Sequence, residues 1–304
     1  MYYFIVNVKS RTGKAQQIWE ELEQELIHKQ VEYEAYITEY EGHGRKLAQE
    51  ICSQPGQIQL IVVGGDGTAN EVIDGMHDFD RISFGYIPTG SGNDLARGLK
   101  ITGTPSEVLH HILSSDKIME VDLGRVSHDG GERLFAISAG LGVDADVCKQ
   151  ALTSKLKKFL NKLHLGQLTY VLLTIKTLFT MPLTDAHLEF DDGTTKDLKG
   201  TIFVAAMIHA CEGGGVPMAP QASAQDGLLS VCCVHGIRRG VCLFYLPVLC
   251  MGKHEKLHGF DVINCRSFHI TLEDPMIVHA DGEFCGELQN MKFECLPHKY
   301  RVIV

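Results

Sequence analysis

The stretch Gly64–Val72, GGDGTANEV, follows the apolar run Leu60–Val63 and decides how the first part of the chain folds. The β-rich run predicts a buried strand, and the residues from Thr68 to Met76 have helical spacing. A glycine loop between a strand and a helix can bind a phosphate, because N–H groups at the helix start point outward and the helix dipole favours an anion. Asp66 in the loop would repel phosphates unless a cation such as Mg²⁺ lies between them.

A second loop of this kind, Thr89–Asp94, follows the strand-like run Ile82–Ile87, and Asn93 or Asp94 could cap the helix after it. Glycine loops that end neighbouring parallel strands lie side by side at the carboxyl edge of the sheet, where such folds bind ligands. A tight turn explains one Asp-Gly loop but not two in succession. The first loop matches neither the P-loop nor the dinucleotide pattern, since Asn70 stands where the latter needs glycine.

Strand and helix patterns alternate over the first part of the chain and predict an α/β domain with a parallel sheet over residues 1–125. The expected strands are Tyr2–Val8, Val31–Thr38, Ile58–Val63 and Ile82–Ile87. The expected helices are 13–28, Arg45–Cys52, Thr68–Met76 and Asn93–Leu99.

The remainder contains many strand-like segments separated by turn signals such as Asp191–Gly193, which predicts a mostly antiparallel β-sandwich over residues 126–287. These segments are Phe135–Gly140, His187–Phe190, Gly200–Ala210, Leu228–His235, Phe268–Leu272, Met276–Ala280, Lys292–Leu296 and Tyr300–Val304. Helices are expected to be inserted at about 144–180. The last segment, about 288–304, is expected to pack back onto the first domain.

Composition narrows the function classes. The 304-residue chain has a net charge of −10, which disfavours a general nucleic-acid binder. Its ten cysteines form no CxxC pair and indicate reduced thiols in the cytoplasm. No apolar run reaches the roughly 18–20 residues that span a bilayer, so any membrane contact is expected to be peripheral.

The segment Val147–Thr184 contains no acidic residue, which is unusual in an acidic chain. Its lysines are Lys149, Lys155, Lys157, Lys158, Lys162 and Lys176, and Leu152, Leu156, Phe159, Leu160 and Leu163 fall on one helical face. This pattern is typical of a basic amphipathic helix on an anionic membrane, but also of a domain helix with a core face and solvated lysines. The sequence leaves both interpretations open.

The two glycine loops, GGDGTANEV and then PTGSGNDLA (Pro88–Ala96), resemble those of the diacylglycerol kinase catalytic family. This family includes soluble bacterial lipid kinases and the sphingosine and ceramide kinases, and its fold is related to those of phosphofructokinases and NAD kinases. The resemblance covers nearly the whole chain. It extends to Asn7 with Thr12–Gly13, Pro220–Val231, Gly252–His254 and Asp281–Glu283.

The resemblance implies an ATP- and Mg²⁺-dependent kinase that phosphorylates a lipid hydroxyl, most simply that of diacylglycerol, with the nucleotide between the two domains. It also implies a cytoplasmic protein that meets its lipid at a membrane surface, with no nucleic-acid partner and with a homodimer as one option. Phosphatidylglycerol, a sphingoid base or NAD are alternative acceptors. A catalytically silent nucleotide- or lipid-binding homologue is the alternative to an enzyme.

The resemblance also assigns site residues. It implies nucleotide binding by Asn7, Thr12, Gly64, Gly65, Asp66, Gly67, Thr68, Asn70, Glu71, Gly90, Ser91 and Asn93, and substrate binding by Asp94. Glu283 is expected to be the general base, with Asp66 as its rival, and Asp66 and Asp281 are expected to support the metal and positioning. Gln221 replaces an aspartate of some relatives at a structural Mg²⁺ site, and Asp226 alone makes a poor ligand set there.

Overall fold

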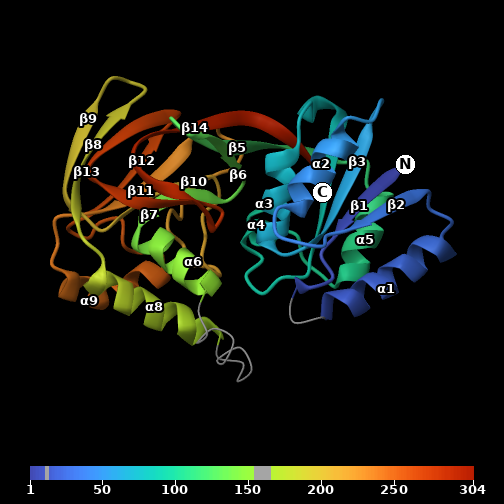
Figure 1. Ribbon diagram of the computed structural model, residues 1–304, viewed down its shortest axis with the longest axis horizontal. Coiled ribbons are helices and arrows are strands. Elements are labelled where there is room, and N and C mark those ends of the chain that lie inside the picture. Colours follow the sequence, from blue (N-terminus) through green and yellow to red (C-terminus); the bar gives the residue numbers. More distant parts are fainter. Residues whose placement is uncertain (11–13, 154–165) are drawn as a thin grey trace. The chain divides into compact units, whose positions relative to one another are not determined.

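The computed structural model describes residues 1–10, 14–153 and 166–304 (Figure 1). The chain divides into two compact units, which are described separately. Unit 1 contains Met1–Leu123, Ala224–Asp226 and Leu296–Val304, and unit 2 contains Gly124–Ser223 and Gly227–Cys295. Thr12 and the lysines at 155, 157, 158 and 162 lie outside the described residues.

Unit 1 is built on a parallel sheet in the order β2-β1-β3-β4, as the alternating pattern predicted. Its strands are β1 (Tyr2–Val6), β2 (Tyr33–Ile37), β3 (Ile58–Gly64) and β4 (Ile82–Pro88). Its helices are α1 (Lys14–His28), α2 (His43–Cys52), α3 (Asp66–Gly75), α4 (Asp94–Gly98) and α5 (Pro105–Ser114).

Helices cover both faces of this sheet, with α1 and α5 on one side and α2 and α3 on the other (Figure 1). Strand periodicity explains the layering, because alternate residues of a strand point to opposite faces. Phe4 and Val63 on one face join Trp19 and Leu22 of α1 and Leu109 of α5 in a single buried cluster. This packing fixes where each strand ends, and therefore where the loops that follow the strands lie.

Two later segments complete unit 1. In strand β14 (Glu283–Ile303), Arg301 and Val302 pair in parallel with Ser83 and Phe84 of β4. The second segment, Ala224–Asp226, was expected in the β-rich domain, but the structure places it in unit 1. The main-chain N–H of Asp122 donates to the Ala224 carbonyl at 2.8 Å, a contact across about a hundred residues of sequence that no local pattern reveals.

Unit 2 is mostly antiparallel and confirms the predicted β-rich domain. Its strands pair in the order β12-β11-β10-β7-β13-β14, and the β8–β9 hairpin is attached to β13. The strands are β5 (Ile118–His128, beginning in unit 1), β6 (Gly131–Phe135), β7 (Ser138–Gly142), β8 (Thr184–Phe190), β9 (Thr195–Thr201), β10 (Phe203–Met207), β11 (Leu229–Val234), β12 (Phe260–Cys265) and β13 (Ser267–Ala280). The helices are α6 (Val143–Thr153), α8 (Gly166–Thr180) and α9 (Arg239–Cys250).

Two of the expected short strands are parts of one long strand. The segments Phe268–Leu272 and Met276–Ala280 form β13, whose pairing with β14 shifts register between Thr271 and Met276. A bulge of this kind lets a strand continue past an irregular point such as Pro275. Among the described residues, no helix is long and apolar enough to cross a membrane.

Candidate functional site

The first glycine loop joins the end of β3 to the start of α3. Gly65 caps α3, and its carbonyl accepts the first helical N–H bond, from Ala69 at 3.1 Å. A side chain at Gly64 would come within 2.7 Å of the Thr68 Cβ, so the turn needs glycine there. Asn7 fixes the loop from the end of β1, because its amide donates to the Thr68 hydroxyl at 2.9 Å.

The second glycine loop lies directly against the first. β3 and β4 pair up to Gly64 and Pro88, and the N–H of Thr89 donates to the Gly64 carbonyl at 2.7 Å. A Cβ on Gly90 would lie 2.7 Å from the Gly65 Cα, so the two backbones touch where only glycine fits. The loops therefore lie side by side at the carboxyl edge of the sheet, where the sequence placed them.

Asp66 links these two loops. Its carboxylate accepts the N–H groups of Asp94 at 3.0 Å and Leu95 at 3.2 Å, which begin α4, and the Tyr86 hydroxyl donates to it at 3.4 Å. Burial and the nearby Asp66 charge hold the pKa of Tyr86 well above its usual value, so Tyr86 remains a hydroxyl donor. A carboxylate oxygen accepts more than one contact, so this arrangement fits a Mg²⁺ ion that is also held by phosphates.

The other predicted loop residues have structural contacts. Glu71 accepts the N–H groups of Gly42 at 2.7 Å and Gly44 at 3.0 Å, and so fixes the start of α2. Asn70 is buried, whereas Ser91 is exposed. Asn93 caps α4 in the left-handed conformation, with φ of 54°. Glu71, which the resemblance implied for nucleotide binding, thus holds the neighbouring β2–α2 loop.

Sequence reasoning missed several polar groups at the same edge of the sheet. The Ser10 and Thr89 hydroxyls lie 3.0 Å apart, and the Lys9 ammonium donates to the Glu39 carbonyl at 2.7 Å. Thr38 is buried directly after β2, and its N–H donates to the Val6 carbonyl at 2.9 Å. The available signal was position, because each of these residues lies within a few positions of a strand end. Such positions meet at one edge of a parallel sheet.

We expect Gly90→Ala to lower the free energy of unfolding by about 1–3 kcal/mol, because the new methyl group overlaps the Gly65 backbone. The affinity for ATP should fall by about tenfold or more, since the two loops must separate. Urea unfolding and calorimetric titration with ATP measure these two effects.

Two glycines serve as controls for Gly90→Ala. A Cβ on Gly75 would lie 2.3 Å from the Arg45 carbonyl oxygen, away from the loops, whereas a Cβ on Gly240 meets nothing within 4 Å. Gly75→Ala should therefore destabilise the fold without a matching loss of ATP affinity per folded molecule, and Gly240→Ala should change neither property. A folded Gly90→Ala protein with unchanged ATP affinity would show that the loop contact is not part of a nucleotide site.

In unit 2, Asp281 organises the turn before β14. Its carboxylate accepts three backbone N–H bonds, from Ala136 at 2.7 Å, Ile137 at 2.8 Å and Ser138 at 2.9 Å. Asp281 itself has a φ of 49°, and Gly282 follows with 85°. These bonds fix a tight turn from which the half-buried Glu283 begins the next strand. Asp281 thus positions Glu283 through the backbone.

His279 supports the same turn from its buried position. The Gly282 N–H donates to the His279 Nδ1 at 3.0 Å, and His279 Nε2 lies 3.2 Å from the Asp144 carboxylate. Because Nδ1 accepts a hydrogen, the neutral ring carries its proton on Nε2 and donates it to Asp144.

His279, Asp144 and Glu212 form a group whose ligand atoms lie within 4.8 Å of one another; over the described ranges, it is the one such group. A metal ligand would need a lone pair on Nε2, which this tautomer does not offer, so the group as arranged is not a metal site. Asp226, which the sequence already indicated to be a poor ligand set on its own, is exposed and belongs to no such group within the part of the chain that the structure describes.

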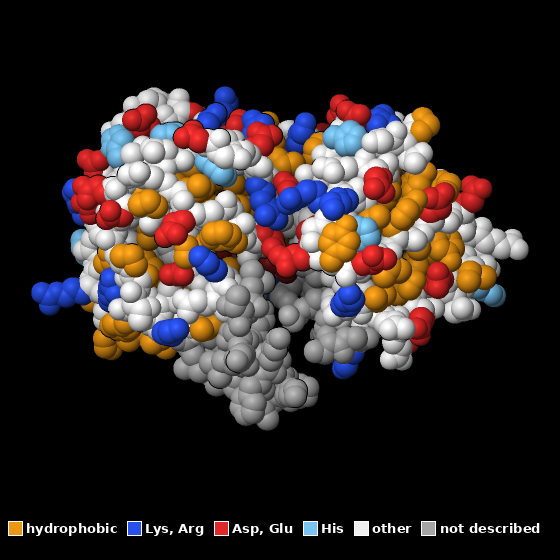
Figure 2. Space-filling view, in the orientation of Figure 1, with side chains coloured by type: hydrophobic (Ala, Val, Ile, Leu, Met, Phe, Trp, Pro, Cys, Tyr) orange, Lys and Arg blue, Asp and Glu red, His pale blue; other side chains and the backbone are white. Residues whose placement is uncertain are grey.

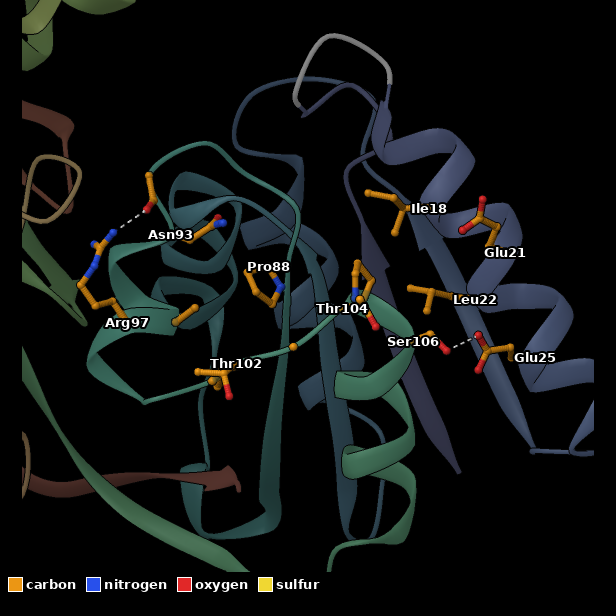
Figure 3. Close-up of a pocket in the computed structure, with 15 residues that line it drawn as sticks. Ile18, Glu21, Leu22, Glu25, Pro88, Asn93, Arg97, Thr102, Thr104 and Ser106 are labelled. Atoms are coloured by element: carbon orange, nitrogen blue, oxygen red, sulfur yellow. Dashed lines mark hydrogen bonds between the residues drawn. The ribbon is translucent and has the colours of Figure 1, made fainter. Parts of the chain in front are cut away.

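A cavity of about 700 Å³ adjoins the second glycine loop in unit 1 (Figure 3). Gly92 and Asn93 line one wall, and Glu21 and Glu25 of α1 line the other. The Ser106 hydroxyl donates to Glu25 at 2.5 Å, which ties α5 to α1. Arg97 is the one cation among the lining residues, and the two carboxylates of α1 outnumber it, which disfavours phosphates in this cavity.

Comparison with known proteins divides the chain in two. Residues 1–126 match the diacylglycerol kinase catalytic domain, and residues 137–304 match the YegS C-terminal NAD kinase beta sandwich-like domain. The chain is 29% identical to the Bacillus subtilis protein YtlR over 297 residues, which are 94% of each chain. It is 27% identical to the diacylglycerol kinase of Bacillus subtilis over 265 residues, 84% of this chain and 81% of that one.

Solved structures show the same fold. A diacylglycerol kinase from Bacillus anthracis str. Sterne superposes with a TM-score of 0.71 at 20% identity, covering 99% of this chain and 96% of that one. An NAD kinase from Archaeoglobus fulgidus in complex with ATP superposes with a TM-score of 0.55 at 12% identity, covering 100% and 94% of the two chains.

Proposed function

Because the chain belongs to the diacylglycerol kinase catalytic domain family and carries the YegS-type C-terminal domain, we propose that it transfers the γ-phosphate of ATP to a lipid hydroxyl, most simply that of diacylglycerol. The observation that carries this proposal is the contact between the two glycine loops at the carboxyl edge of the unit 1 sheet. This edge offers backbone N–H groups at the start of α3, where an anion is favoured.

In this proposal the first loop holds the phosphates. The N–H groups of Gly65, Gly67 and Thr68 face the anion at the start of α3, and the absence of side chains at Gly65 and Gly90 lets the phosphates approach the backbone. Asp66 would hold Mg²⁺ together with the phosphates. The bound ion supplies charge neutralisation for phosphoryl transfer. Asn7 keeps Thr68 in place. Ser91 and Asn93 form the second wall of the nucleotide site, and Asp94 contacts the lipid substrate.

The acceptor hydroxyl must lose its proton, and we assign this step to Glu283. A carboxylate can accept that proton when it lies within hydrogen-bond reach of the hydroxyl. Asp281 and His279 fix the turn that carries Glu283, so the base sits on a rigid support. Asp66 is the rival candidate, but its oxygens already accept the N–H groups of α4. Hydrogen bonds to the charged form make a carboxylate a weaker base.

The alternative acceptors are phosphatidylglycerol, a sphingoid base or NAD. The alternative to an enzyme is a catalytically silent protein that binds a nucleotide or a lipid. The likeness to an NAD kinase supports a shared fold and not a shared acceptor, and Asp66, Asp94 and Glu283 support a working enzyme. We further propose that the protein works in the cytoplasm and meets its lipid at the membrane surface.

The decisive assay is phosphate transfer from labelled ATP to a panel of lipids in mixed micelles with Mg²⁺. We expect one labelled lipid product, and its chromatographic mobility identifies the acceptor. NAD offered as the acceptor in the same assay tests whether the protein is instead an NAD kinase. ADP formation without any labelled acceptor, or no turnover at all, would overturn the lipid kinase proposal.

A further inference from the structure

Helix α9 of unit 2 is apolar on nearly every side yet buries little of its surface. Of its 12 residues, all of them described, only Leu249 is buried. Phe244 is 80% exposed, Leu243 is 37% exposed, and Met251, just after the helix, is 60% exposed. Large exposed apolar patches mark places where a protein meets a partner or a membrane. This helix is therefore a candidate interaction surface.

The exposed side chains share one face of the helix. Tyr245 and Leu249, four residues apart, point inward, and the Tyr245 ring lies 6.0 Å from the Phe260 ring. Phe244, Pro247 and Met251 follow the three- and four-residue spacing that places side chains on one helical face. The inner face thus anchors α9 to the sheet and leaves the outer face available.

The end of α8 extends this apolar surface. The Arg239 guanidinium donates to the main-chain carbonyls of Phe179 at 2.8 Å and Met181 at 2.6 Å, and so satisfies the carboxyl end of α8. Phe179 is 48% exposed. We call Phe179, Leu243, Phe244 and Met251 the α9 patch. Hydrophobic side chains gather at the lower left edge of unit 2, where α9 lies (Figure 2).

Charge around the α9 patch selects its partner. Neither α8 nor the stretch Gly236–His254 contains an acidic residue, although the whole chain has a net charge of −10. Arg238 and Lys253 flank α9 and are exposed, and Glu255 with Lys256 follows at the rim. Exposed apolar side chains bordered by cations suit an anionic bilayer. A second copy of this chain would bring cations against cations.

We propose that the α9 patch is the surface by which this protein docks on an anionic membrane. Phe244 and Met251 enter the boundary between headgroups and acyl chains, and Arg238 and Lys253 lie at the level of the lipid phosphates. The docking serves the proposed function, because a lipid hydroxyl is reached at a bilayer, but the binding itself needs neither ATP nor phosphoryl transfer.

Vesicle flotation of the full chain, without ATP, tests the docking. We expect binding to phosphatidylcholine vesicles that contain phosphatidylglycerol and weaker binding to phosphatidylcholine alone. Phe244→Ser should lower the partition coefficient about tenfold. The double change Arg238→Gln with Lys253→Gln should lower it by about fivefold per charge, and only on the anionic vesicles.

Matched controls lie in unit 1. Ile27 on α1 is 57% exposed, so Ile27→Ser removes a similar exposed side chain. Lys29→Gln with Lys117→Gln removes the same charge from exposed positions. Both controls should bind vesicles like the parent protein. Thermal unfolding of Phe244→Ser should be unchanged, because the side chain packs against little.

Three results would overturn the docking proposal. The first is a parent protein that does not float with anionic vesicles, and the second is Phe244→Ser binding as tightly as the parent. The third is a parent dimer that Phe244→Ser converts to a monomer, since a second copy would then cover the patch. Phosphorylation of lipids in mixed micelles, measured in parallel, separates the two proposals. If the protein does not dock on vesicles but is fully active in mixed micelles, the docking proposal fails and the kinase proposal stands. If the protein docks through the α9 patch but phosphorylates no lipid, the docking proposal stands and the kinase proposal fails.

Discussion

Glu283→Gln is expected to lower kcat about 10²–10⁴-fold while the KM for ATP changes little. Glutamine keeps the size of the side chain and its place at the start of β14, but it cannot take a proton from an alcohol. The nucleotide is assigned to the glycine loops of unit 1, so ATP binding should survive. Initial rates with the lipid acceptor, at varied ATP concentration in mixed micelles, separate the two parameters.

Glu287→Gln provides the matched control, because Glu287 lies on the same strand, is exposed and undergoes the same chemical change. Its kcat should stay within about twofold of the parent value, as surface substitutions usually have small effects. Thermal unfolding of both variants checks that the folds are equally stable. A Glu283→Gln enzyme as active as Glu287→Gln would remove Glu283 from the mechanism and favour Asp66 as the base.

The base position also shows what a local sequence pattern cannot predict. Asp281-Gly282-Glu283 has the sequence of a turn with two carboxylates, for which the resemblance implies a base at Glu283 and a supporting role for Asp281. In the structure Asp281 has a structural role, because its carboxylate accepts backbone N–H groups about 145 residues earlier in the chain. Contacts across such separations depend on how β7 and β13 pair, and this pairing leaves no periodic signal.

The fold of unit 1 was predictable for a physical reason. Buried parallel strands such as β3 are continuous apolar runs, and glycine is required where the β3 and β4 loops touch, so both features are visible in the sequence. Helix α5 was not predicted, although Thr104 and Glu107 form a capping box with Pro105 at its start. A capping box marks only the start of a helix, whereas the predicted helices of unit 1 rest on apolar periodicity.

Unit 2 was harder to predict in detail. The frequent turn signals predicted the antiparallel sheet of unit 2, yet β13 and β14 are longer than the strand segments predicted within them. The apolar stretch Val241–Cys250, too short to span a bilayer, lies within helix α9. Composition did not show that one face would remain exposed, because burial depends on which neighbours the fold supplies.

Asp66→Asn is expected to damage both stability and turnover, unlike Glu283→Gln. An asparagine amide places an N–H donor where one oxygen now accepts from Asp94 or Leu95, so α4 loses a partner for its first N–H groups. The free energy of unfolding should fall by about 1–3 kcal/mol, the cost of an unsatisfied buried donor. The same change removes the charge that would face Mg²⁺ and the phosphates, and kcat/KM should fall on the order of 100-fold or more.

Asp80→Asn is the control, since Asp80 is an exposed aspartate of unit 1 and loses the same charge. Urea unfolding and mixed-micelle kinetics on both variants, with Mg²⁺ varied, separate the two effects of Asp66→Asn. The Mg²⁺ concentration needed for half-maximal activity should rise for Asp66→Asn and stay constant for Asp80→Asn. Unchanged stability would show that the bonds to α4 contribute little to folding. An unchanged Mg²⁺ requirement would mean that Asp66 acts only as the link between the two glycine loops.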